Sequence, residues 1–158
     1  MNLYLVRHAK AESASGRKND AERELTNEGI NILKNSIETW KNYLSKVDFI
    51  ISSPLVRAVQ TAEQIKLELN FSSGVLKNHL LIPGSSPSDI LHIIKQHKPE
   101  NLLLVGHQPD ISNAISSFIG YDNFEIPFRP ASFAKITFEG KPASGKGVLE
   151  ILLPPVLK

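Results

Sequence analysis

Two histidines and two arginines follow short apolar runs at three distant places in the chain, one of the arginines a turn into the helix predicted after the second run. They are Arg7, His8, Arg57 and His107. The apolar runs span residues 3–6, 47–51 and 102–105. Arginine keeps its charge at neutral pH and its planar fork binds two phosphate oxygens, while a neutral imidazole can attack phosphorus and carry the phosphoryl group. These residue types favour phosphoryl transfer through a phosphohistidine, provided that the fold brings them together.

The elements expected around these residues alternate between strands and helices. Compact apolar runs predict strands, and apolar positions at steps of three and four predict amphipathic helices. The predicted strands span residues 3–6, 47–51, 75–76, 102–105, 131–138 and 147–152, and the predicted helices 27–44, 54–70, 86–99 and 109–118. Thr26 and Ser86 are predicted as helix caps, Pro54 as a first-turn residue, and Gly29 as merely tolerated, while 10–24 is predicted as an irregular loop.

This alternation predicts an α/β fold, a three-layer sandwich with a mostly parallel central sheet flanked by helices. In open α/β sheets, ligands bind beyond the carboxyl ends of the strands. The two histidines and two arginines are therefore expected at one edge of the sheet. Arg7 and Arg57, together with the backbone at Gln108 or Leu55 where a helix begins, would form a site for a dianion. His107, if protonated, would stabilise charge on the phosphoryl oxygens.

Composition sets the outer limits of these expectations. The 158 residues are 41% hydrophobic and 22% charged, which predicts one folded domain rather than a disordered chain. The absence of cysteine excludes disulfides, a thiol nucleophile and a thiolate zinc site. The net charge of +2 and the scattered lysines give no support to nucleic-acid binding, and no apolar run is long enough to span a bilayer. We expect a cytoplasmic monomer. We also expect no metal and no cofactor, because the chain shows neither a Walker A loop nor an acidic metal cluster.

Four sequence blocks, taken in their order along the chain, resemble the motifs of a known protein family. They are Arg7-His8-Ala9, the segment 23–29 (Arg-Glu-Leu-Thr-Asn-Glu-Gly), the segment 53–61 (Ser-Pro-Leu-Val-Arg-Ala-Val-Gln-Thr) and Val-Gly-His at 105–107. With them the chain resembles, from end to end, the histidine phosphatase superfamily and more narrowly the small SixA-type phosphohistidine phosphatases. The resemblance implies a phosphoglycerate-mutase-like fold and His8 as the phosphorylated nucleophile. It also implies Arg7, Arg57 and His107 as the rest of the phosphate pocket.

The chain departs from the family pattern at two places. Ala9 stands where many members have glycine, a change that is expected to be tolerated if the backbone there is not left-handed. Most members also carry an acidic proton donor after the second helix, but no Asp or Glu occurs between Leu69 and Ser88. Among the titratable residues there, His79 is the candidate donor. An alkoxide leaving group needs such a donor, whereas an imidazole can take its proton from solvent as it leaves. The missing carboxylic acid therefore favours phosphohistidine, with its P–N bond, over phosphoesters as the substrate.

The segments between the site residues are filled by the predicted elements and leave no room for a cap insertion. We therefore expect residues 1–158 to form a single catalytic domain with an open pocket, suited to a phosphohistidine-bearing partner protein. The leading hypothesis is hydrolysis of protein-bound phosphohistidine through a covalent intermediate on His8.

Three alternatives remain beside this hypothesis. The chain could be a phosphatase for small-molecule phosphoesters, or a non-catalytic module that binds a phosphorylated partner through Arg7 and Arg57. The third is a metal-dependent hydrolase that uses His8, His107 and Asp110, which is disfavoured because the neighbouring arginines would repel a cation.

Overall fold

The computed structural model describes residues 1–14, 19–121 and 126–157. The strands within these ranges are β1 (Asn2–Arg7), β2 (Phe49–Ser52), β3 (Leu76–Lys77), β4 (Asn101–Gly106), β5 (Phe133–Thr137) and β6 (Val148–Leu153). The α-helices are α1 (Asn27–Trp40), α2 (Val56–Glu68), α3 (Pro87–His97) and α4 (Asp110–Ile119). Short 3-10 helices are η1 (Asp20–Glu22), η2 (Lys41–Tyr43) and η3 (His79–Leu81).

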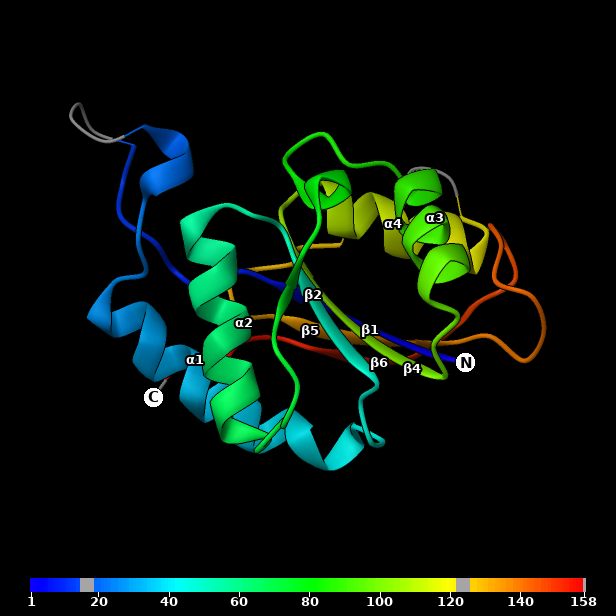
Figure 1. The fold of residues 1–158 in the computed structure, drawn as a ribbon, viewed down its shortest axis with the longest axis horizontal. Helices are drawn as coiled ribbons and strands as arrows, with labels where there is room; N and C mark the ends of the chain where they lie inside the picture. Colours follow the sequence, from blue (N-terminus) through cyan, green and yellow to red (C-terminus); the bar gives the residue numbers. More distant parts are fainter. Residues whose placement is uncertain (15–18, 122–125, 158) are drawn as a thin grey trace.

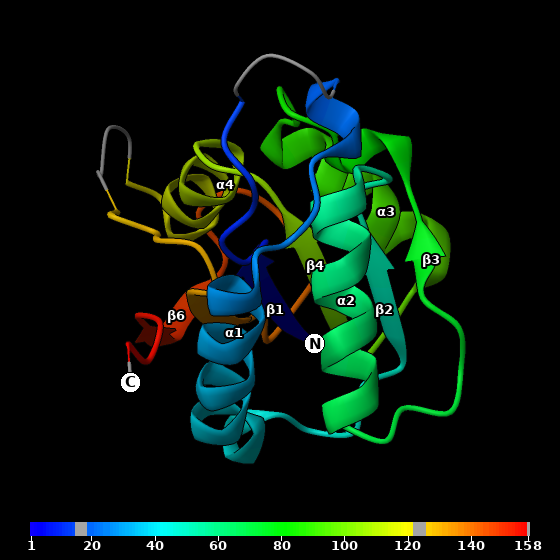
Figure 2. The ribbon, with the colours of Figure 1, turned by 90° about the vertical axis from the view of Figure 1, so that its left-hand side faces the viewer.

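The strands form one central sheet in the order β3-β2-β4-β1-β5-β6. Neighbouring strands from β3 to β1 run parallel, and β5 and β6 are antiparallel to their neighbours. Helices α1 and α2 cover one face of the sheet and α3 and α4 the other, as Figures 1 and 2 show. The expected three-layer α/β sandwich with a mostly parallel sheet is confirmed.

Both faces of the central strands are buried, which explains why these strands are continuously apolar. Along β1, Leu3 and Leu5 pack into the core beneath α3 and α4, while Tyr4 and Val6 pack into the core beneath α1 and α2. Strand β4 repeats this alternation in register, because each residue of β1 pairs with the residue at the same position of β4. In β1 the charged side chain is therefore confined to the carboxyl end, where Arg7 is the last residue of the strand and His8 is the first residue of the loop that follows.

Helix ends follow the capping residues that the sequence indicates. The Thr26 side chain accepts a hydrogen bond from the Gly29 N–H, and Ser86 and Asp89 form a capping box at α3. Gly29 is more than tolerated, since a Cβ atom at this position would collide with the carbonyl oxygen of Lys10. The chain between β1 and α1 can therefore approach the first turn of the helix only because this residue is glycine.

Several boundaries differ from the predicted ones, most clearly at two helix ends. Helix α1 ends at Trp40 and continues as the 3-10 turn η2, and α2 begins at Val56, so that Pro54 precedes the helix. In the predicted loop 10–24, η1 forms a short 3-10 helix, while residues 15–18 lie outside the described residues. No helix within the described part of the chain combines the length and the apolar character that crossing a membrane requires.

Candidate active site

Strands β1 and β4 bring the two predicted histidines to the same place. Arg7 pairs with Gly106 at the ends of these strands, and the His8 backbone N–H donates to the Gly106 carbonyl oxygen at 3.1 Å. The ring centroids of His8 and His107 lie 5.1 Å apart. Both side chains are buried, with 8% and 3% of their surface exposed. Two residues ninety-nine positions apart in sequence are thus neighbours at the carboxyl edge of the sheet.

The hydrogen bonds of His8 determine which ring nitrogen carries its proton. Nδ1 lies 2.8 Å from the carbonyl oxygen of Ala9, which can only accept, so Nδ1 donates. The other nitrogen, Nε2, accepts a hydrogen bond from Arg57 Nε at 3.3 Å. The pKa of His8 is lowered to about 4, mainly by burial; the Ala9 contact opposes this lowering, and the charges of Arg57, Arg7 and Arg23 add to it. At neutral pH His8 is therefore a neutral imidazole with its lone pair on Nε2.

Helix α2 supplies Arg57 and also holds the loop that follows β1. Thr61 Oγ1 accepts a hydrogen bond from the Ala9 N–H at 3.0 Å and donates to the Arg57 carbonyl oxygen at 2.7 Å. The preceding residue, Gln60, accepts a hydrogen bond from the Leu25 N–H at 2.7 Å through its Oε1. Ala9 is buried and its backbone is not left-handed, which removes the need for glycine there. The block 53–61 thus provides both the guanidinium and the contacts that position its partners.

Arg7 approaches the same pair of rings from the end of β1. Its Nη1 donates to the Phe128 carbonyl oxygen at 2.8 Å, and its Nε is buried without a hydrogen-bond partner among the described residues. The charge of Arg7 contributes to lowering the pKa of both His8 and His107. The four predicted site residues therefore form one positively charged cluster at the carboxyl edge of the sheet.

His107 is neutral in this cluster rather than positively charged. Its pKa is lowered to about 3, mainly by burial and further by the nearby His8, Arg57 and Arg7, while Asp20 opposes the lowering. Its Nε2 lies 2.8 Å from Ser53 Oγ, and its Nδ1 is buried without a partner in the described part of the chain. The imidazolium considered from sequence is not formed at pH 7, because the desolvated site and two arginines disfavour the charge.

Asp20 is a site residue that sequence analysis did not identify. Its carboxylate forms an ion pair with Arg57 Nη2 at 3.0 Å and with Arg23 Nε at 3.3 Å, and its carbonyl oxygen accepts from Arg57 Nη1 at 2.6 Å. Desolvation raises the pKa of the Asp20 carboxyl, but the hydrogen bond and the charge of Arg57 lower it overall. The carboxylate thus binds the same guanidinium that is predicted to bind an anion. The sequence offered only its place in a polar loop, which is no specific signal.

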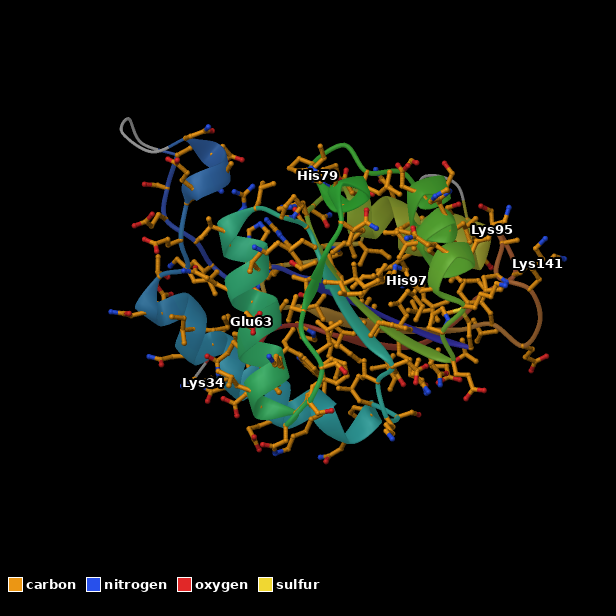
Figure 3. All side chains as sticks on the ribbon, viewed as in Figure 1. Lys34, Glu63, His79, Lys95, His97 and Lys141 are labelled. Atoms are coloured by element: carbon orange, nitrogen blue, oxygen red, sulfur yellow. The ribbon has the colours of Figure 1, made fainter. Side chains whose placement is uncertain are left out.

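Other predicted residues lie outside this cluster. His79 is exposed on η3, which follows the edge strand β3, at the periphery of the view in Figure 3. Gln108 follows His107 directly, but α4 begins only at Asp110. The Asp110 carboxylate accepts a hydrogen bond from the Gly84 N–H at 2.9 Å. Among the described residues no group of three or more histidine or acidic side chains is gathered as a metal site.

The depressed histidine pKa values predict a defined pH dependence. In a ring-proton NMR titration of the ligand-free protein we expect His8 to titrate near pH 4, far below the 6.5 of a free imidazole, because burial disfavours its charged form. Between these values the unfolded state binds more protons, so the contribution to folding stability is complete above pH 6.5 and is lost as the pH falls through 4. A His8→Gln variant identifies the signal. A midpoint near 6.5 would contradict the buried, arginine-flanked site.

Comparison with known proteins finds similarity to histidine phosphatases in both sequence and fold. The family described as the histidine phosphatase superfamily (branch 1) matches residues 3–78. A Haemophilus influenzae protein described as a phosphohistidine phosphatase SixA homolog is 28% identical over 153 residues, which cover 89% of this chain and 90% of that protein. A structure of the protein histidine phosphatase SixA complexed with tungstate has a TM-score of 0.80 at 21% identity, covering 98% of this chain and 97% of that chain. A SixA structure from Agrobacterium tumefaciens has a TM-score of 0.81 at 23% identity, with coverages of 98% and 97%.

Proposed function

The chain belongs to the histidine phosphatase superfamily as a SixA-like phosphatase, and from this premise we propose that it hydrolyses phosphohistidine on proteins. His8 is the nucleophile that carries the phosphoryl group. The observation that carries this proposal is the state of His8: its Nδ1–H is bound by the Ala9 carbonyl, and its lone pair on Nε2 lies beside the Arg57 guanidinium. A neutral, oriented imidazole next to a fixed positive charge is what attack on a phosphoryl dianion requires.

The reaction has two steps in this proposal. First, His8 Nε2 forms a bond to phosphorus while the P–N bond to the substrate imidazole breaks, and that imidazole takes a proton from solvent. Water then attacks the phosphorus on His8 and the P–Nε2 bond breaks. Inorganic phosphate leaves, and the neutral imidazole of His8 is regenerated. Both steps move charge onto the three equatorial phosphoryl oxygens, so fixed positive groups accelerate both.

Arg7, Arg57 and His107, with the backbone of Gln108, are the groups that would hold those oxygens. Support comes from burial and charge: Arg57 is 4% exposed, and Arg7 Nε and His107 Nδ1 are buried nitrogens without partners in the described part of the chain. Buried polar groups of this kind usually have a partner, and a tetrahedral oxyanion would provide one. A relative of the same fold is described as complexed with tungstate, itself a tetrahedral dianion.

The choice of phosphohistidine over phosphoesters rests on the leaving group. The segment from Leu69 to Ser88 contains no carboxylic acid, and the candidate donor His79 is exposed on η3. An imidazole needs less help to leave than an alkoxide does. In the same proposal, residues 1–158 form one catalytic domain without a cap. This domain acts as a monomer on a phosphorylated partner protein and uses no metal ion.

Relative turnover of three substrates tests this proposal. We expect fast phosphate release from a phosphohistidine peptide, slower release from an aryl phosphate and least from an alkyl phosphate, because only the alkyl ester demands a strong proton donor. The order should persist in the presence of a strong chelator. Preference for the alkyl ester would favour a small-molecule phosphatase. Tight peptide binding without phosphate release would favour a binding module.

The ion pair between Asp20 and Arg57 leads to a separate prediction about anion binding. The Asp20→Asn variant is expected to bind inorganic phosphate about 2- to 5-fold more tightly, because a negative charge is removed from beside the incoming dianion. The effect is modest because the Asp20 side chain is 57% exposed, and the backbone contact of residue 20 with Arg57 remains. Inhibition of aryl phosphate hydrolysis by phosphate provides the measurement.

Glu22→Gln is the matched control for this prediction, because Glu22 lies in the same 3-10 helix, carries the same charge and is exposed. The control should leave phosphate inhibition unchanged. Weaker inhibition in Asp20→Asn would show that the carboxylate chiefly orients Arg57 instead of competing with phosphate.

A further inference from the structure

Ser53 connects the end of β2 to His107 in a way that the proposed reaction does not yet use. The residue is fully buried, and its backbone N–H donates to the Val105 carbonyl oxygen at 3.0 Å. Its Oγ lies 2.8 Å from His107 Nε2. The hydroxyl therefore contacts the ring nitrogen opposite to the unpartnered Nδ1.

The direction of this hydrogen bond follows from the other contact of the hydroxyl. The Leu55 N–H, which can only donate, points at Ser53 Oγ at 3.4 Å. Within the described residues, the acceptor in reach of the Ser53 hydroxyl proton is His107 Nε2. A buried hydroxyl without an acceptor is costly, so the proton points to that nitrogen. Nε2 is then the acceptor, and a neutral imidazole must carry its single proton on Nδ1.

We propose that Ser53 is a positioning residue that holds His107 in the tautomer with the proton on Nδ1, so that a neutral N–H donor faces the phosphoryl group. This inference rests on the proposed function, because it assumes that an anion binds between His8 and His107. The opposite tautomer would present a lone pair to phosphoryl oxygens and would repel them. The hydrogen bond at one ring nitrogen thus decides what the other nitrogen can do.

The geometry also explains why a serine hydroxyl matters at this strand end. His107 is uncharged in the buried pocket, since burial and the neighbouring positive groups lower its pKa to about 3. It can stabilise charge on the phosphoryl oxygens only through a correctly placed N–H dipole. Ser53 directly follows β2 and His107 directly follows β4, and these two strands are adjacent and parallel. The serine hydroxyl is thereby placed where it can orient the N–H of His107.

Two serine variants provide a matched comparison. Ser53→Ala should lower kcat with an aryl phosphate by about 10- to 100-fold, by analogy with the loss of the partner that orients a metal-ligating imidazole. Ser53→Thr, which keeps the hydroxyl, should recover most of that loss. Ser52→Ala is the control, because Ser52 is equally buried and its hydroxyl donates to the Ser53 carbonyl oxygen instead of to His107. The control should keep kcat near the wild-type value.

The tautomer itself is read by ¹⁵N NMR of histidine-labelled protein, with a His107→Asn variant to assign the signals. In the wild type at pH 7 we expect a protonated Nδ1 and an unprotonated Nε2 on His107, and in Ser53→Ala a shift of the proton towards Nε2. A wild-type proton on Nε2 would overturn the inference, even if Ser53→Ala does not fold. So would equal losses of kcat in Ser53→Ala and Ser52→Ala. The NMR measurement needs no substrate, so failure of the phosphohistidine proposal would leave it readable.

Discussion

Turnover should fall by on the order of 10⁴-fold or more when His8 is replaced by alanine. The variant removes the Nε2 lone pair that lies 3.3 Å from Arg57 Nε, and with it the atom to which the phosphoryl group would be transferred. Without a covalent intermediate, water would have to attack the substrate directly. The measurement is kcat on a phosphohistidine peptide, together with trapping of enzyme-bound phosphate. Wild-type protein should yield a phosphate label that is labile in acid and stable in alkali, and the variant should yield none.

His92→Ala is the control for this experiment. His92 is an exposed residue of α3, on the far side of the sheet from α2, and its loss should leave both turnover and labelling intact. Full turnover in His8→Ala would remove His8 as the nucleophile. Lost turnover with an unchanged acid-labile label would instead place the phosphoryl group on another histidine.

Arg57→Lys should lower kcat/KM by about 10²- to 10³-fold, although the positive charge is kept. Arg57 directs Nε to His8 and its two terminal nitrogens to the side where Asp20 lies, a forked arrangement that a single ammonium group cannot reproduce. The loss should appear in the chemical step as well as in binding, because the oxygens gain charge during transfer. Steady-state kinetics on the peptide and on an aryl phosphate provide kcat and KM separately.

Arg129→Lys is the control for charge-preserving substitution, because Arg129 is an exposed arginine. It should leave kcat/KM unchanged. Since Arg57 is buried, urea unfolding of Arg57→Lys must show that the variant remains folded at the assay temperature. Activity of a folded Arg57→Lys variant near that of the wild type would mean that charge alone suffices and that the fork has no role.

The fold follows from patterns that are local in sequence. Residues 3–6 and 102–105 are apolar without interruption because both faces of their strands are buried, and such runs can be found without knowing their partners. Thr26 and Ser86 cap their helices through residues three positions away, so their effect is equally local. The boundaries that differed, at Trp40 and Val56, lie where no such capping side chain marks the end.

Arg7, His8, Arg57 and His107 could be found in advance for a related reason. Arg7, His8 and His107 come just after predicted strands, and Arg57 lies in the first turn of the helix predicted to follow another strand. Parallel strands must place their carboxyl ends at one edge. Ala9 and Gly29 show what the sequence could not reveal. The sequence states which residue stands at each position, but whether glycine is required there depends on which atoms of the folded chain approach it. The Lys10 carbonyl makes glycine obligatory at position 29, and the Thr61 hydroxyl receives the Ala9 N–H.

The electrostatic state of the pocket came only from three-dimensional contacts. Asp20 lies 37 residues from Arg57 and Ser53 lies 54 residues from His107, and neither pair leaves a periodicity or a motif that indicates contact. Burial then makes both imidazoles neutral, which residue types alone could not establish. Residue order is enough to bring charged side chains to a common edge, because strand direction is a property of the backbone. Proton positions and ion pairs depend on distances of a few ångströms between loops, and those exist only in the folded chain.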